Sequence, residues 1–423
     1  MNNSPKSAQK RRNSILSPYL SAHIINLISV LEHGQSHAFV LEMYVYACTF
    51  WRLHDCRNCK DRMAERISMG RVIDEITRES WLNKTFPEWG TWLTEEIAAA
   101  KIPEKTLSMW WLGNMGLWIK SDQGTNVVID MWNQTGKQTI GKGEMKKGHQ
   151  MMRMSGVRNL QPNRRNQPFV IDPFEVRDID ILCVTHSHSD HLDQTTAAVV
   201  TRNCPNATFV GPQDVADKWI AWGVPAERVV VLHPNESIKV KDVEVIGLES
   251  FDRTMLLTID DPNESLKGKP VRDMNELALN YLVKTNGGSV YHSGDSHYSN
   301  MYVKHGKEHQ IDIACVAYGE NPIGITDKLT SSDVLKVAEA LQCKVIIPTH
   351  YDIWTNFMAD PKEIVYLWKY RRDRMQYKFK PFIWQVGGRY DYPGDTDHIE
   401  YMYDRGFHDA FDYETDLYYD SFL

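Results

Sequence analysis

The chain of 423 residues is 42% hydrophobic and 24% charged, and it carries a formal net charge of -7. Its mean hydropathy of -0.45, with no apolar stretch near the roughly 20 residues of a membrane-spanning helix, excludes a membrane-embedded protein. The acidic balance disfavours nucleic acid as a partner. We therefore expect a cytoplasmic globular protein with no membrane and no nucleic-acid partner, long enough for one large domain or two to three ordinary ones.

The first 68 residues differ in composition from the rest of the chain. Nine basic and five acidic side chains give this segment a charge of +4, whereas the remainder carries -11. The C-x-x-C pair of Cys56 and Cys59 has no second pair beside it, so it is a weak signal for a zinc or redox site. The seven cysteines show no regular framework, which favours reduced thiols. We expect residues 1–68 to be an extension, artefactual or disordered, with translation starting at Met69.

The first elements expected after this extension are short. A helix is predicted around Leu93–Lys101, after a stretch that mixes aromatic residues with carboxylates. Three apolar runs follow, separated by glycine and polar turns, at Thr106–Trp111, Gly116–Lys120 and Asn126–Met131. Short runs with turn residues between them predict an antiparallel meander.

Residues 137–166 are basic and irregular. A solvated loop is the ordinary interpretation of such a segment. The embedded Met151 and Met152 favour instead a loop held against the body of the protein. Its cations are then candidates to bind an anion, and the residues singled out are Lys147, Arg153 and Arg158.

Strand and helix signals alternate through the rest of the chain. Helices are predicted at Leu192–Arg202, Pro212–Trp222 and Ser331–Leu341, and strands at Ile181–Val184, Ala207–Val210, Ile311–Ala317 and Lys344–Pro348. Hairpins are predicted within Ser237–Leu248 and between Leu277–Lys284 and Ser289–His292, across an Asn-Gly-Gly turn. A meander followed by strand and helix units predicts an α/β sandwich with functional residues on loops at one end.

Residues 185–191 are the most informative stretch of the chain, and they read Thr-His-Ser-His-Ser-Asp-His. His186 and His188 are two residues apart at the end of an apolar strand, so both can point the same way. Asp190 and His191 lie in the following turn and can face a second ion. Imidazole and carboxylate ligands suit Zn, Mn or Fe. A run of surface histidines before a helix is the alternative, but the spacing after a strand favours a metal site.

Two later residues have a similar setting. Asp295 follows a predicted strand in the sequence Ser-Gly-Asp, and His350 follows a later strand in Pro-Thr-His. Asp295 could instead cap a helix, and His350 could be a core histidine. Given the histidine-rich stretch, we favour metal ligation for both.

In their order along the chain, these residues resemble the ligands of the metallo-β-lactamase superfamily. Longer strings resemble, within that superfamily, a lactonase family that acts on L-ascorbate 6-phosphate; they include Met109-Trp-Trp-Leu-Gly113, the nine residues from His292 to Asn300, and the nine from Lys380 to Gly388. The resemblance runs from about Ile76 to Leu423. It implies that residues 69–423 form one catalytic domain, a metallo-β-lactamase-like αβ/βα sandwich with the metal site at one edge of the two sheets.

The resemblance also implies a role for each candidate ligand. His186 and His188 would hold a first metal, and Asp295 would bridge it to a second. The remaining ligands of the second metal would be Asp190, His191 and His350. Asp130, which closes a predicted strand, would orient a ligand histidine by accepting the proton of its other ring nitrogen.

The chain departs from the common superfamily pattern at the third ligand of the first metal. No histidine occupies that place, and Asp252 is the nearest carboxylate. Oxygen ligation there would favour Mn over Zn, with one or two ions per chain. His292 and His297, which flank Asp295, are ambiguous between substrate contact and packing.

The implied reaction is hydrolysis of the lactone ring of L-ascorbate 6-phosphate to 3-keto-L-gulonate 6-phosphate. Water activated by the ions would attack the ester carbonyl, and Asp190 would pass the proton to the leaving oxygen. The partner is then a small phosphorylated sugar-acid lactone, and the resemblance implies a homo-oligomer, a hexamer. A metal-dependent phosphodiesterase of the same superfamily is the alternative, and an inert metal-binding regulator is a third hypothesis.

Overall fold

The computed structural model describes residues 71–85, 93–137, 163–257, 268–319, 328–351 and 359–401. All of them belong to one compact unit of the chain, Arg71–Leu423. The predictions made for residues 1–68 and for Lys147, Arg153 and Arg158 lie outside the described residues.

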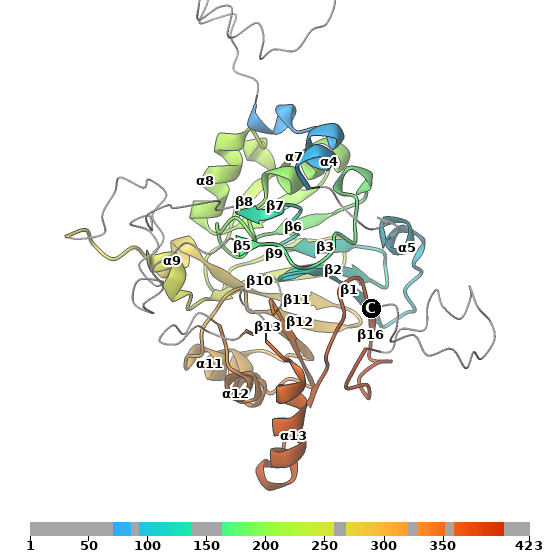
Figure 1. Ribbon diagram of the computed structural model, residues 1–423, viewed down its shortest axis with the longest axis vertical. Helices are drawn as coiled ribbons and strands as arrows, with labels where there is room; N and C mark the ends of the chain where they lie inside the picture. The colour runs from blue at the N-terminus through green and yellow to red at the C-terminus, as the bar shows by residue number, and fades with distance from the viewer. Residues whose placement is uncertain are drawn as a thin grey trace, which may run out of the picture. The chain divides into compact units, whose positions relative to one another are not determined.

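The first of two central sheets has seven strands in the order β16-β1-β2-β3-β6-β7-β8 (Figure 1). Their bounds are β1 Leu107–Gly113, β2 Gly116–Ser121, β3 Asn126–Ile129, β6 Ile181–Cys183, β7 Thr208–Gly211, β8 Val229–Val231 and β16 Arg389–Tyr392. Strands β1 to β3 form the predicted antiparallel meander, and β3, β6, β7 and β8 run parallel. The parallel strands therefore end at one edge of the sheet.

The second sheet also has seven strands, in the order β15-β14-β13-β12-β11-β10-β9. Their bounds are β9 Ser237–Val240, β10 Val243–Glu249, β11 Leu279–Thr285, β12 Gly288–His292, β13 Ile313–Ala317, β14 Val345–Thr349 and β15 Lys380–Pro381. Both predicted hairpins are present, and Thr285 pairs with Gly288 across the tight turn. Two further short strands, β4 Gly136–Lys137 and β5 Asn163–Arg164, pair with each other.

Helices cover the outer face of each sheet (Figure 1). On the first sheet lie α4 Arg78–Thr85, α5 Leu93–Ala99, α7 Gln194–Asn203 and α8 Gln213–Trp222; on the second lie α11 Met301–Glu308, α12 Ser331–Leu341 and α13 Lys362–Met375. The remaining short helices are α9 Arg253–Leu257, α10 Met274–Leu277, η1 Val72–Glu75, η2 Pro173–Glu175 and η3 Ala226–Arg228. This arrangement is the expected αβ/βα sandwich. Among the described helices, none has the length and apolar character needed to cross a membrane.

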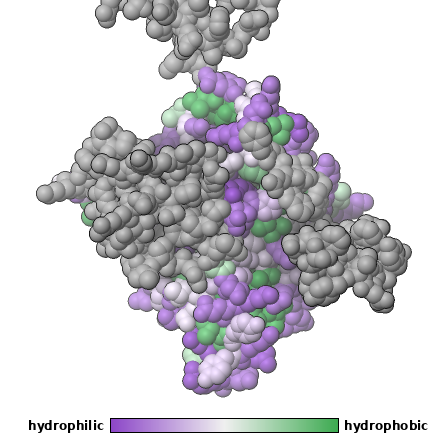
Figure 2. Space-filling view, in the orientation of Figure 1, coloured by the Kyte–Doolittle hydropathy of each residue, from purple (hydrophilic) through white to green (hydrophobic). Residues whose placement is uncertain are grey.

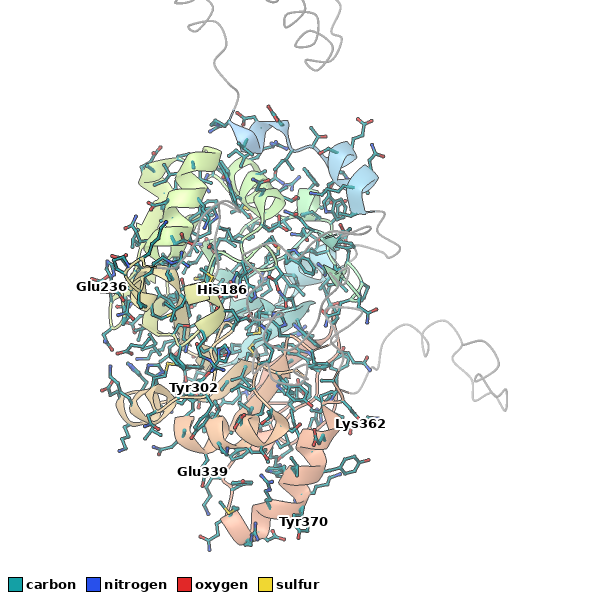
Figure 3. The ribbon with its side chains drawn as sticks, turned by 60° about the vertical axis from the view of Figure 1, so that its left-hand side comes forward. His186, Glu236, Tyr302, Glu339, Lys362 and Tyr370 are labelled. Carbon is teal, nitrogen blue, oxygen red and sulfur yellow. The ribbon has the colours of Figure 1, made fainter. Side chains whose placement is uncertain are left out.

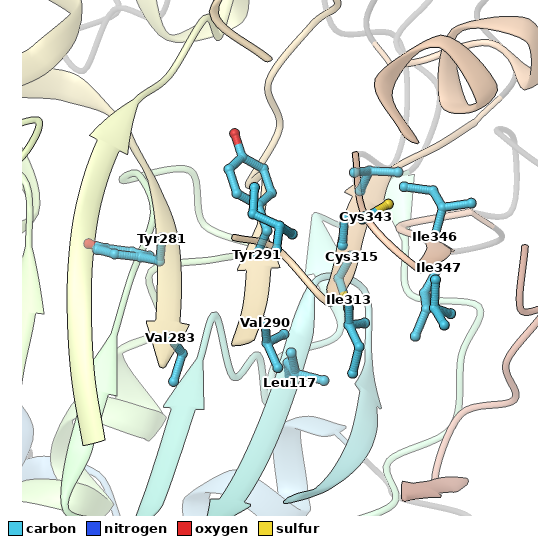
Figure 4. Packing of buried hydrophobic residues seen from close by; sticks show 14 of the residues in the cluster. Leu117, Tyr281, Val283, Val290, Tyr291, Ile313, Cys315, Cys343, Ile346 and Ile347 are labelled. Atoms are coloured by element: carbon cyan, nitrogen blue, oxygen red, sulfur yellow. The ribbon is translucent and has the colours of Figure 1, made fainter. Parts of the chain in front are cut away.

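The two faces of the first sheet pack into different apolar clusters, which the alternation of side chains along β1 illustrates. Met109 and Trp111 pack between the two sheets, whereas Trp110 and Leu112 pack under the helices of the first sheet. Figure 4 shows part of the larger buried cluster, to which Leu117 of β2 in the first sheet and Val290 of β12 in the second both belong. Burying each large apolar side chain contributes about 1.5–3 kcal/mol, so this cluster fixes the two sheets against each other.

The surface is polar and the described cysteines are inside. Hydrophilic residues dominate the face drawn in Figure 2 outside its grey regions. The free thiols of the described residues are buried, at Cys183, Cys204, Cys315 and Cys343. Reduced thiols were the expectation for these four.

Candidate metal centre

The candidate ligands lie where strands of both sheets end at one edge of the sandwich. His186 follows β6 of the first sheet, whereas Asp295 follows β12 and His350 follows β14 of the second. The two sheets are joined here, because the Leu279 N–H donates to the Thr185 carbonyl at 2.9 Å. In Figure 3 His186 lies in the interior, between the helices of the two outer faces.

Six side chains form two groups whose ligand atoms lie within 4.8 Å of one another. One group is His186, His188 and Asp295, and the other is Asp190, His191 and His350. Asp295 faces both. Its Oδ1 lies 3.3 Å from His191 Nε2 and 3.4 Å from His350 Nε2, and its Oδ2 lies 4.0 Å from His186 Nε2.

Several buried atoms of these side chains, and one of the neighbouring Asp252, have no hydrogen-bond partner among the described residues. They are Nε2 of His191, both ring nitrogens of His350, Oδ1 of Asp295 and Oδ2 of Asp252. Leaving one such group unsatisfied costs about 1–3 kcal/mol. Divalent cations would supply the missing partners, and imidazole nitrogens with carboxylate oxygens are the donors that Mn, Fe and Zn take. The residues present therefore fit a metal centre.

Asp130 orients His191. It is fully buried directly after β3, at a φ of 48°, a left-handed conformation that aspartate tolerates better than most residues. Its carboxylate accepts hydrogen bonds from the Thr185 N–H at 2.8 Å and the Thr185 hydroxyl at 2.6 Å, and it lies 2.8 Å from His191 Nδ1. With Nδ1 turned to Asp130, Nε2 is the ring nitrogen that faces Asp295 and is left to bind a cation.

The electrostatics of the second group call for positive charge. Burial lowers the pKa of His191, but the nearby carboxylates of Asp295, Asp130 and Asp190 raise it by more than burial lowers it. The pKa of His191 therefore stands well above its ordinary value. Burial raises the pKa of Asp190, yet His191 and His350 hold it far below the usual range. A cluster with this excess of carboxylate charge suits a cation.

His350 is held by the turn between β1 and β2. Its φ is 68°, and its backbone N–H donates to the Asn114 carbonyl at 3.1 Å. The Asn114 side-chain amide in turn donates to the Asp190 carbonyl, and its backbone N–H donates to Gln167 Oε1 at 2.6 Å. Sequence reasoning missed Asn114, whose Gly-Asn turn gave only a turn signal.

Asp252 lies beside the first group. Its Oδ1 accepts from the backbone N–H groups of Thr254, at 2.9 Å, and Met255, at 3.3 Å, and so caps α9. Its other oxygen, Oδ2, lies 3.7 Å from His186 Nε2. One oxygen of Asp252 therefore caps the helix α9, and the other faces the candidate ligand His186.

The two histidines that flank Asp295 differ. His292 is fully buried, with Nε2 donating to the Met115 carbonyl at 2.8 Å and Nδ1 accepting from the Gly294 N–H at 3.2 Å. Because both ring nitrogens are engaged with backbone groups, the structure favours the packing alternative for His292 over the substrate contact. His297 is 5% exposed, and its Nδ1 lies 3.2 Å from the Phe251 carbonyl.

Gly294 allows the two sheet edges to approach. Its φ is 48°, and a Cβ placed on it would lie 2.9 Å from Thr185 Cβ, closer than real side chains tolerate. Any larger residue would push the Asp295 turn away from the loop of His186. The glycine therefore sets the distance between the two strand ends.

Two lysines near the site had no sequence signal. Lys328, 12% exposed, forms an ion pair with Asp295. Burial raises the pKa of Asp295, but His350, Lys328 and His191 hold it well below its usual range. Lys218 of α8 donates to the hydroxyl of Ser187, between the two first histidines, at 2.9 Å. Each lysine comes from a part of the chain far from its partner, so spacing alone could not reveal it.

The fold and this cluster define a class of protein. The family model described as "Beta-lactamase superfamily domain" matches residues 108–350, and the chain belongs to this superfamily.

Within the superfamily, the chain is similar to curated lactonases. It is 56% identical over 353 residues to a protein of Escherichia fergusonii named "Probable L-ascorbate-6-phosphate lactonase UlaG", with 83% of this chain and 99% of the relative covered. A protein of the same name from Salmonella heidelberg is 55% identical over 352 residues, with the same coverage of 83% and 99%. The chain therefore belongs to the family of these lactonases.

Solved structures with low sequence identity also match this chain. The isothiocyanate hydrolase from Delia radicum gut bacteria is 15% identical, covers 67% of this chain and 98% of its own, and has a TM-score of 0.48. A likeness of this size carries no functional conclusion.

Proposed function

We propose that this protein hydrolyses the lactone ring of L-ascorbate 6-phosphate to 3-keto-L-gulonate 6-phosphate, in the catabolism of ascorbate. The observation that carries the proposal is the placement of Asp295 between two buried groups of histidine and carboxylate ligands. The 56% identity to relatives named as L-ascorbate-6-phosphate lactonases supports the choice of substrate.

The proposed ligands divide between two cations. His186, His188 and Asp252 would hold the first, and Asp190, His191 and His350 the second, while Asp295, whose two oxygens face different groups of histidines, would serve both. When bound, such cations lower the pKa of a shared water and polarise an ester carbonyl. Carboxylate-rich ligation favours manganese, with zinc and iron as alternatives, and with one cation if the first site stays empty.

The protein's own groups supply positioning and proton transfer. Asp130 fixes the His191 ring so that Nε2 faces the site. Asp190, whose side chain is 15% exposed, is the more accessible carboxylate beside Asp295 and is proposed to carry a proton to the leaving ring oxygen. No thiol nucleophile is invoked, since the free cysteines of the described residues are buried.

The anionic substrate needs cations outside the metal ligands. Lys147, Arg153 and Arg158 remain the proposed contacts for the phosphate, and they lie outside the described residues. We add Lys328, because its ammonium lies against Asp295 while its side chain keeps 12% exposure. His297, close to the Asp295 turn, remains a proposed substrate contact.

The wider context is also a proposal. Residues 69–423 would form the catalytic domain, with residues 1–68 an extension to it. The protein would act in the cytoplasm as a homo-oligomer, a hexamer in keeping with the resemblance, on a small-molecule partner and not on nucleic acid or at a membrane.

A paired assay tests the reaction. Purified protein loaded with Mn²⁺ is expected to open the ring of L-ascorbate 6-phosphate and to leave bis-p-nitrophenyl phosphate intact, with a chelated sample as control. Robust turnover of the diester alone would make the protein a phosphodiesterase. Metal-replete protein that hydrolyses neither compound would support an inert regulator.

A further inference from the structure

Ser296, the residue after Asp295, makes three buried hydrogen bonds through its hydroxyl. It donates to Asn280 Oδ1 at 2.8 Å, and it accepts from the Phe251 N–H at 3.1 Å and from the Ser250 hydroxyl at 2.8 Å. A serine hydroxyl has one proton and two lone pairs, so these bonds saturate it. Ser296 is 1% exposed, and water does not compete for these contacts.

The direction of these bonds is fixed by a chain of buried groups behind Asn280. The Asn280 amide donates to the Tyr291 hydroxyl at 2.8 Å, which leaves the tyrosine proton for His305 Nδ1 at 3.0 Å. His305 Nε2 then donates to Glu249 at 2.9 Å. Since the Asn280 amide nitrogen is the donor to Tyr291, its oxygen must accept, and Ser296 must donate. The network therefore has one arrangement of protons, which makes it stiff.

The hydroxyl joins the two loops that bring carboxylates to the first cation. Ser250 and Phe251 directly precede Asp252, and Ser296 directly follows Asp295. A backbone bond reinforces the link, because the His297 N–H donates to the Phe251 carbonyl at 3.0 Å. Without a metal cation, Lys328 offsets only part of the repulsion between the two carboxylates, and the hydrogen bonds of Ser296 hold their loops together.

We propose that Ser296 is a positioning residue for the first cation site. Its hydroxyl holds the Asp252 loop against the Asp295 loop, at a spacing that leaves their oxygens 3.7 Å and 4.0 Å from His186 Nε2. The inference rests on the proposed ligand assignment and does not depend on the substrate. It predicts a selective effect, since Asp190, His191 and His350 are held by Asp130 and Asn114.

The test is a titration of the cation-free full chain with Mn²⁺, followed by calorimetry and by electron paramagnetic resonance. Wild-type protein is expected to bind two ions. Ser296→Ala is expected to weaken one of them by about 10- to 100-fold, the usual effect of removing a group that orients ligands, while the other changes less than about two-fold. Ser250→Ala removes only one of the three bonds and is expected to weaken the same ion less, by a few-fold.

Ser293→Ala is the matched control. Ser293 is also fully buried and two residues before Asp295, but its hydroxyl donates to the Gly294 carbonyl and accepts from the Ala317 N–H, away from Asp252. Both ions should bind it as they bind wild type. Should Ser296→Ala fail to fold, Ser250→Ala carries the test.

Three results overturn the inference: unchanged Mn²⁺ binding in the folded variants, an equal loss at both sites, or a wild-type protein that binds a single ion. Selective loss of one ion in a protein that opens no lactone would leave the positioning role standing and remove only the proposed reaction.

Discussion

The metal centre has two halves, a first with His186, His188 and Asp252 and a second with Asp190, His191 and His350, and Asp295 faces both. The two halves are supported by different kinds of contact. His191 lies against Asp130, and His350 is held by the carbonyl of Asn114. Asp130 also reaches the first half indirectly, because the Thr185 hydroxyl that donates to it lies 3.0 Å from His186 Nδ1. In the first half, His186 and His188 lie 2.9 Å apart through ring nitrogens, and Asp252 also caps a helix.

This difference has a mechanical consequence. The second half is preorganised by direct contacts to the buried Asp130 and Asn114, whereas the first half shares its contacts with the fold around α9 and β12. The second half should therefore keep its cation under perturbations that empty the first. Mutations in one half, or in the residue that both share, test whether the affinities for the two cations change independently.

The largest effect is expected for Asp295→Asn, which alters the carboxylate that faces both halves. Both cations should bind weakly, and kcat/KM for lactone opening should fall by roughly three orders of magnitude, since several kcal/mol of transition-state stabilisation depend on them. Metal analysis and steady-state kinetics measure this. Asp312→Asn is the control, because Asp312 is a buried carboxylate that pairs with Lys344 instead. A variant with two cations and a normal rate would remove Asp295 from the centre.

Asp130→Asn should act mainly on the second half, because Asp130 contacts His191 directly and His186 only through Thr185. An amide nitrogen facing His191 Nδ1 favours the tautomer with its proton on Nε2, and that proton blocks ligation. The affinity for the second cation should fall by about 10- to 100-fold, with the first little changed. Asp193→Asn, which keeps the cap of α7, is the control. Equal weakening of both cations would show that the halves are not separate.

Asp252→Ala should affect the first half alone and cost stability as well. The first cation should bind at least about ten-fold more weakly, and the lost cap should lower the free energy of unfolding by about 1 kcal/mol. Asp273→Ala removes the cap of α10 without touching His186, so it should reproduce the stability loss and leave metal binding intact. If Asp252→Ala keeps both cations and the full rate, the third ligand of the first cation lies elsewhere.

The sequence predicted the parts of this centre that follow local rules. Apolar runs ended where the ligands began, so His186, Asp295 and His350 could be assigned to strand ends. The helix predicted at Ser331–Leu341 has the bounds of α12, and the structure shows a capping box at Thr330 where it begins. The fold followed from the order of such elements and from the resemblance.

What the sequence did not predict depends on contacts between distant segments. His292 adjoins the Asp295 turn, yet it points to Met115 of the other sheet, a contact that no spacing encodes. The helix α13 was missed because exposed Tyr366 and Tyr370 blur its apolar face. Asn114 and Lys328 meet their partners only after the sheets pack.

The smallest expected effect is a difference in the number of protons that the two halves release when they bind their cations. The carboxylates around His191 raise its pKa well above the ordinary value, although burial opposes them, so the ring holds a proton at pH 7 when no cation is bound. Burial first, and then His191 and His188, hold the pKa of His186 well below its ordinary value, so His186 has no proton to release.

The sign of the pH dependence follows. A raised pKa stabilises the cation-free protein below the unfolded value of about 6.5, and this contribution is lost as pH rises through the folded pKa. Binding of the second cation must displace the His191 proton, so it should tighten with rising pH and release about one proton at pH 7. Binding of the first cation should release no proton from His186. Calorimetry in two buffers of different ionisation enthalpy measures both steps, and equal proton release in the two steps would contradict the unequal protonation of the halves.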